Sequence, residues 1–190
     1  MNQLRFLSLL LAFCGLLFFS ACEDDPEPVN EEELITTVKL TFTKSGSTPI
    51  VAQWKDLDGP GGNNPVLTPA TVTLAANSTY AVAVEMLDET KSPAEDITEE
   101  IEEEDDEHQL FFGRSTNLNL AIAYGDTDKN GKPIGLSNTF TTGAASTGTL
   151  TVILLHELDK SATGVTQGNP ANAGGETDIE TTPPFSITIQ

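Results

Sequence analysis

Hydrophobic and polar residues alternate with a period of two along much of the chain beyond residue 34. The clearest run lies at residues 37–43, where Val38, Leu40 and Phe42 are separated by threonine and lysine. A second clean run closes the chain at residues 185–189. Alternation of this kind is typical of a strand that buries one face and exposes the other.

Seven to nine such strands are expected, each short, rich in Thr, Val and Leu, and separated by turn residues. The segments are 35–43, 50–54, 71–74, 79–87, 110–112, 118–124, 150–158 and 185–189. This spacing predicts an all-β fold, an antiparallel immunoglobulin-like β-sandwich. In the run 150–158, His156 shares a face with Leu154 and Leu158, so we expect a strand histidine at the edge of the core rather than a catalytic base.

One segment departs from the strand pattern and predicts a short acidic helix inserted between strands. Ser92-Pro93-Ala94-Glu95 has the form of a capping box with proline at the first helical position. Ile97 and Ile101 then stand four residues apart, as on one face of a helix. We therefore expect a helix over residues 93–105.

The first residues predict an export signal. Residues 6–19 form an apolar run too short to span a bilayer comfortably, and Arg5 precedes them. Phe19-Ser20-Ala21-Cys22 resembles a bacterial lipobox, which implies lipidation of Cys22; the alternative is an ordinary secretory signal with an accidental cysteine. The expected organisation is a lipoprotein signal peptide at 1–21, a lipidated cysteine with an acidic flexible tether at 22–33, and a single β-sandwich domain at 34–190.

Composition narrows the possible functions. Asp and Glu number 29 against 9 Lys and Arg, a formal net charge of −20, which makes nucleic acid an improbable partner. Two cysteines cannot build a disulfide framework. The chain contains no nucleophile elbow, no phosphate-binding loop and no His-Glu-x-x-His motif, so we do not expect an enzyme.

The acidic helix is the first candidate metal site. Residues 95–107 contain ten acids and no base, and their like charges four apart destabilise a helix by roughly 1–3 kcal/mol unless a cation relieves them. Glu104 and Asp105 lie four and three residues before His108, so one helical face would present carboxylates and an imidazole together. The carboxylates favour Ca²⁺, and the imidazole allows Zn²⁺. The alternative is a solvated acidic insertion that docks on a basic partner surface.

A second candidate metal site is a loop motif. Asp126, Asp128 and Asn130, followed by glycine, match positions 1, 3, 5 and 6 of an EF-hand calcium loop, but Ser137 stands at position 12 and the flanks look like strands. A partial calcium loop is one interpretation. The other is a strand connection rich in residues that turn well, and the Asp-x-Asp-Gly motif at 56–59 carries the same two interpretations.

Several segments resemble a family of small Bacteroidota lipoproteins of flavobacterial type: 93–109, 124–136, 141–148 and 174–180. Some members carry the automatic label "type 1 periplasmic binding fold superfamily protein". That label conflicts with the pattern above, because such a fold needs alternating strands and helices. The family looks like a set of companions of TonB-dependent receptors, and the acids after Cys22 resemble an export signal to the cell surface.

The resemblance implies an outer-membrane lipoprotein, anchored through the lipid at Cys22, with its body at the cell surface or facing the periplasm. The expected function is a binding module that captures divalent cations or a nutrient for a TonB-dependent receptor. The alternative is a structural or interaction lipoprotein whose acidic helix docks a basic partner surface and holds no ion.

Overall fold

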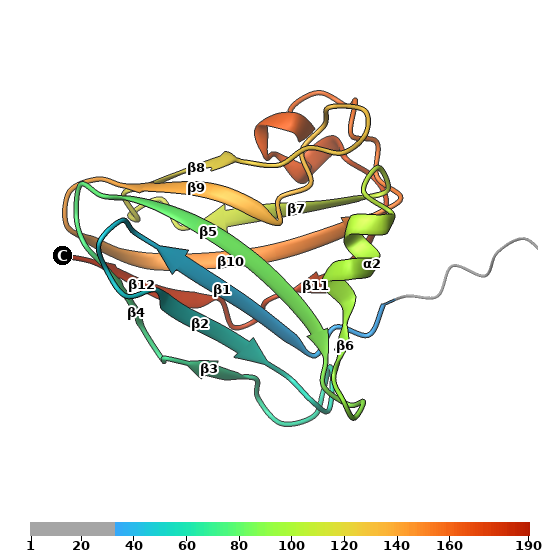
Figure 1. The fold of residues 1–190 in the computed structure, drawn as a ribbon, viewed down its shortest axis with the longest axis horizontal. Helices are drawn as coiled ribbons and strands as arrows, with labels where there is room; N and C mark the ends of the chain where they lie inside the picture. The colour runs from blue at the N-terminus through green and yellow to red at the C-terminus, as the bar shows by residue number, and fades with distance from the viewer. Residues whose placement is uncertain (1–32) are drawn as a thin grey trace, which may run out of the picture. The chain divides into compact units, whose positions relative to one another are not determined.

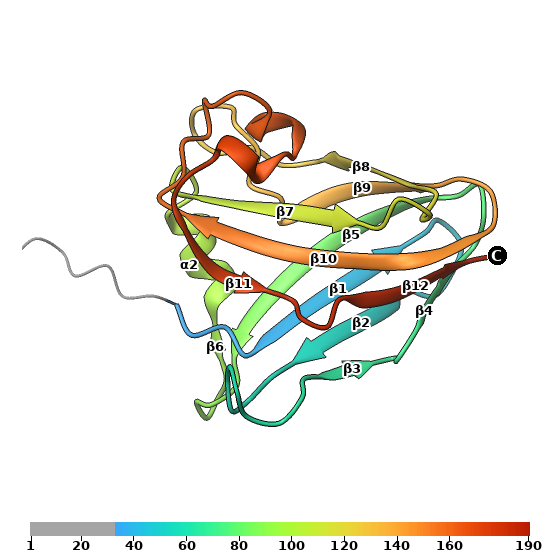
Figure 2. The same ribbon diagram turned by 180° about the vertical axis from the view of Figure 1, so that it is seen from behind.

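A computed structural model describes residues 33–190 as two β-sheets packed face to face (Figures 1 and 2). The predicted signal peptide at 1–21, the lipidated Cys22 and the tether up to residue 32 lie outside the described residues. Within residues 33–190, no helix has the length and hydropathy needed to cross a membrane.

The first sheet has seven strands. Their order is β3 (Val66–Thr68), β2 (Ile50–Lys55), β1 (Thr37–Thr43), β5 (Thr79–Asp88), β9 (Ser137–Thr142) and β8 (Leu120–Tyr124), with β6 (Glu95–Asp96) paired to the end of β5. All of these pairs are antiparallel.

The second sheet has five strands. The central strand is β10 (Ser146–His156), whose first half pairs with β12 (Phe185–Ile189) and whose last residues pair with β11 (Glu176–Glu180). Residues 150–156 of β10 also pair with β7 (His108–Arg114), and β4 (Val72–Leu74) pairs with β12. Only β12 and β4 run parallel. The predicted all-β antiparallel sandwich with one short helix is therefore confirmed, with twelve strands among the described residues instead of seven to nine.

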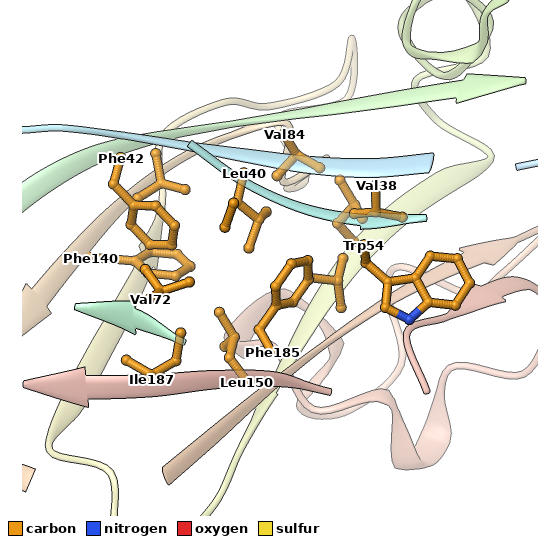
Figure 3. Packing of buried hydrophobic residues seen from close by; sticks show 14 of the residues in the cluster. Val38, Leu40, Phe42, Trp54, Val72, Val84, Phe140, Leu150, Phe185 and Ile187 are labelled. Atoms are coloured by element: carbon orange, nitrogen blue, oxygen red, sulfur yellow. The ribbon is translucent and has the colours of Figure 1, made fainter. Parts of the chain in front are cut away.

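The core fills the space between the two sheets. Val38, Leu40 and Phe42 of β1 point into it and are at most 1% exposed, as their alternation predicts. Phe42 meets Phe140 of β9 edge to face, with ring centroids 5.9 Å apart. Figure 3 shows these side chains facing Phe185 and others from the second sheet. Packing of the two apolar faces is the main source of stability.

The helix α2 (Ile97–Glu103) is shorter than predicted. Its N-cap is Asp96, whose carboxylate accepts a hydrogen bond from the Thr98 backbone N–H, so the predicted start at residue 93 is wrong. Ile97 and Ile101 are buried as expected. The helix ends at residue 103, with no basic side chain in its last turn to favour continuation.

One end of the sandwich brings distant parts of the chain together. In both views, α2 lies beside the start of β7, the end of β10 and the start of β11, opposite the end that holds the C-terminus. The first described residue, Glu33, also reaches this end, through contact with His108.

The segment between β10 and β11 supports this end from outside. It contains two short 3-10 helices, η1 (Val165–Gln167) and η2 (Pro170–Asn172), and packs Val165 against Phe111 in a second, smaller core.

Candidate metal centre

Two histidines face each other at this end of the sandwich. His108 is the first residue of β7, His156 is the last of β10, and the two are direct partners across the antiparallel pair. Their rings stack, with centroids 4.2 Å apart and planes inclined by 13°. His156 continues the inward face of Val152 and Leu154, which confirms its predicted place at the edge of the core. His108 lies on a strand, so its predicted place on the helix is wrong.

Two carboxylates complete this cluster, which we call the inner set: Glu33, His108, His156 and Asp178. Asp178 stands where the β10–β11 register shifts, since Leu154 pairs with Ile179 and Leu155 with Thr177. A bulge of this kind turns a side chain out of the regular alternation. The Nε2 atom of His108 lies 3.9 Å from the Asp178 Oδ2 atom and 3.1 Å from the Glu33 Oε1 atom.

The backbone at Gly175, just before β11, lies very close to the backbone at His156, at the end of β10. Gly175 has φ +77°, and a Cβ on it would lie 2.2 Å from the His156 carbonyl oxygen. Glycine is therefore required at this position, because any side chain would collide with the strand that carries His156.

The inner set is almost completely shielded from solvent. The side chains of His108, Asp178, His156 and Glu33 are 0%, 2%, 6% and 7% exposed. The Glu33 Oε2 atom is buried and has no hydrogen-bond partner among residues 33–190. Buried carboxylate oxygens are normally paired, so this Glu33 oxygen is one that a bound cation would satisfy.

Contact between Glu33 and His108 shifts the pKa values of both groups in opposite directions. Burial alone lowers the pKa of His108, but contact with Glu33 and the charge of that carboxylate outweigh it, and the pKa lies above the ordinary value of 6.5. Burial alone raises the pKa of Glu33, but contact with His108 and the charge of that imidazole lower it, and the pKa lies below the ordinary value of 4.5. The Nδ1 atom of His108 lies 3.3 Å from the Glu104 carbonyl oxygen. A proton on Nδ1 would direct the lone pair of Nε2 toward the carboxylates.

This arrangement suits a divalent transition metal. The ligand atoms of the inner set all lie within 4.8 Å of one another. Two imidazoles and two carboxylates form a donor set typical of Zn²⁺, whereas Ca²⁺ prefers oxygen ligands alone. Stacked rings direct their lone pairs in parallel, so a single ion bound to both rings requires them to tilt apart.

A second, exposed group of ligands borders the inner set. We call Glu104, Glu107 and His156 the outer set; their ligand atoms also lie within 4.8 Å of one another. The His156 Nε2 atom lies 3.6 Å from the Glu107 Oε2 atom, and the Glu107 side chain is 55% exposed. The two sets share His156.

The other predicted ligands lie elsewhere and have protein partners. Asp105 accepts a hydrogen bond from the Lys129 backbone N–H at 3.0 Å. The two carboxylate oxygens of Asp126 accept from the N–H groups of Gly135 and Ser137, at 2.8 and 2.7 Å. Neither residue belongs to the inner or the outer set, and Glu104 and His108, which were predicted to share a site, fall into different sets.

In the predicted calcium loop, the Asp128 carboxylate pairs with a lysine, Lys160. The Lys160 Nζ atom lies 3.1 Å from the Asp128 Oδ2 atom, and both residues are 6% exposed. The other Asp128 oxygen accepts from the N–H groups of Asn130 and Lys132, each at 2.8 Å. Lys160 also donates to the Asp105 carbonyl oxygen. An ammonium group therefore sits beside the loop carboxylate, where the motif suggests an ion.

The Asp-x-Asp-Gly motif at 56–59 shows the turn alternative. Asp56 accepts from the Gly59 N–H at 3.1 Å, and Asp58 accepts from the backbone and side-chain amides of Asn63. This loop lines a cleft of about 750 Å³ together with Glu33 and Asp178.

Comparison of the chain with protein-family models, curated proteins and solved structures finds no match. The resemblance to Bacteroidota lipoproteins therefore stays a prediction. The assignment of a site depends on the geometry alone.

Proposed function

We propose that this protein binds a divalent transition-metal ion in the inner set, with Zn²⁺ as the first ion to test. The observation that carries the proposal is the meeting of two imidazoles and two carboxylates, drawn from four separate segments, in a nearly solvent-free cluster. Carboxylates and neutral imidazoles are ligands that Zn²⁺ takes in proteins, and binding of the ion would release the proton that His108 holds beside Glu33.

The neighbouring protein groups support a ligand role for His108. Metal-bound imidazoles usually donate their other ring N–H to a carbonyl or carboxylate, which fixes the ring orientation. The Glu104 carbonyl oxygen lies in that position, 3.3 Å from Nδ1 of His108. In this role the end of α2 orients the buried histidine.

We further propose that the binding body is held at the outer membrane through a lipid on Cys22 and passes its ion to a TonB-dependent receptor. The support for this placement is the sequence of residues 1–22 and the lipoprotein resemblance. The alternative role, docking on a basic partner, is supported by the exposure of Glu95, Asp96, Glu99, Glu102 and Glu103 on one acidic segment.

Isothermal titration calorimetry of the chelator-treated full chain with Zn²⁺ tests metal binding. We expect one tight site in the native protein and its loss in the double variant Glu33→Gln, Asp178→Asn, which keeps the side-chain shapes. Glu180→Gln is the matched control, since it removes an exposed acid from the same strand as Asp178. Equal Zn²⁺ affinity in all three proteins would contradict the proposal.

Thermal unfolding gives an independent readout of the same ion. Zn²⁺ at a hundredfold over its Kd should add about 2.7 kcal/mol to the stability, a rise in Tm of roughly 5–10 °C for a body of this size. Ca²⁺ at the same ionic strength should give a much smaller rise, because two of the four ligands are nitrogens. Equal rises with both ions would indicate screening of an acidic surface instead of a site.

A further inference from the structure

His156 is oriented toward two groups of ligands that differ in their access to solvent. Its side chain is 6% exposed, and its ligand atoms lie within 4.8 Å of Glu33 and Asp178 on one side and of Glu104 and Glu107 on the other. One side of the ring stacks on His108, and the Nε2 atom lies 3.6 Å from Glu107, beyond hydrogen-bond length. A buried imidazole thus lies within reach of two exposed carboxylates, Glu104 and Glu107, as well as of the inner set.

We propose that Glu104, Glu107 and His156 form a second, outer metal site, through which a divalent ion reaches the inner set. This inference depends on the proposed function of the inner set. The outer carboxylates capture the ion from solvent, His156 shares it, and Glu33, Asp178 and His108 then replace the outer ligands one at a time.

The shape of the histidine pair supports this order of events. In the stacked arrangement the rings cannot both direct lone pairs at one ion, so the stack must open before the inner set is complete. His156 is the ring that can bind first, because its Nε2 atom already lies next to the exposed Glu107. Glu104 connects the two steps, since its carboxylate belongs to the outer set and its carbonyl oxygen contacts His108.

The cleft that Glu33 and Asp178 line is a poorer route for an ion. Its loop acids Asp56 and Asp58 are already bonded to their own loop, and no histidine lines it. Glu180 is the remaining acid that lines the cleft, outside that loop and the inner set. The Glu180→Gln variant therefore tests entry through the cleft.

The test compares the rate of Zn²⁺ release with the equilibrium affinity. Zinc-loaded full chain is mixed with excess chromophoric chelator to obtain the release rate, and competition at equilibrium gives Kd. In Glu104→Gln, Glu107→Gln we expect release about tenfold slower at unchanged Kd, so that binding is slower by the same factor. Glu99→Gln, Glu102→Gln removes two exposed charges from the neighbouring helix α2 without touching the outer set, and should leave both rates near the native values.

Each outcome separates this inference from the proposed function. Native protein that binds no Zn²⁺ overturns both. Tight binding with equal slowing in the two double variants overturns the outer site, because charge steering alone would explain the rates. Weaker affinity with faster release in Glu104→Gln, Glu107→Gln would make these residues permanent ligands and would overturn the outer site as an entry route. Slower release confined to Glu180→Gln would also overturn it, because the ion would then enter through the cleft.

Discussion

Replacing Lys160 with methionine should destabilise the protein by about 3 kcal/mol. The Lys160 ammonium and the Asp128 carboxylate lie 3.1 Å apart, and both residues are 6% exposed. Removal of one partner of a buried pair typically costs about 3–5 kcal/mol, because the other charge stays buried and unpaired. The low end applies here, since Asp128 keeps the N–H groups of Asn130 and Lys132.

Urea unfolding at neutral pH, followed by the fluorescence of Trp54, measures this loss directly. Lys129→Met is the matched control: its ammonium pairs with Asp106 at 2.8 Å, but its side chain is 63% exposed. We expect little change in the control, since exposed pairs contribute little to stability. A loss below about 1 kcal/mol for Lys160→Met, or losses equal in the two variants, would refute the role of the buried pair.

Three further predictions concern the end of the sandwich. In chelator, the free energy of unfolding should be highest between pH 4.5 and 6.5, which are the ordinary pKa values of Glu33 and His108. It should fall as the pH rises above 6.5, because folded His108 keeps its proton to higher pH than unfolded His108. A rise in urea-unfolding stability above pH 6.5 would contradict this. Gly175→Ala should destabilise by more than about 1 kcal/mol and weaken Zn²⁺ binding, since its φ is positive and its Cβ would collide with the His156 carbonyl; an unchanged Tm and Kd would argue against it. Ile101→Ala, which empties a fully buried site beneath α2, should cost about 2–5 kcal/mol in urea unfolding, and a loss within error of zero would show that α2 does not pack as described.

Local patterns predicted the strands whose apolar residues carry the core. The alternation of Val38, Leu40 and Phe42 defines the inward face of β1, and the same periodicity places His156 at the edge of the core. Strand β9 was missed because Phe140 is its one large apolar residue, and its pairing with β5 and β8 comes from distant segments. A short-range pattern cannot report such pairing.

The candidate site was predicted only in part, for three physical reasons. The i, i+4 spacing of Glu104 and His108 was interpreted as helical, although a turn between α2 and β7 also brings the Glu104 carbonyl to His108. Asp178 belongs to β11, a strand that was not predicted, and it enters the inner set where the register with β10 shifts.

The third reason is the separation of partners along the chain. Glu33 was assigned to the tether, yet it contacts a histidine 75 residues later in the sequence. Lys160 lies 32 residues beyond Asp128, so the loop looked like a calcium motif without its ammonium partner. Contacts of this range depend on the completed fold.

The central claim is that the inner set binds a transition metal, and a crystal structure of the zinc-loaded full chain tests it most directly. Anomalous scattering at the zinc edge should give a peak about 2.0–2.2 Å from a ring nitrogen of His108 and from carboxylate oxygens of Glu33 and Asp178. The His108 and His156 rings should have tilted out of their 4.2 Å stack. Intact stacking, with zinc absent or bound only to exposed acids of residues 95–107, would contradict the claim.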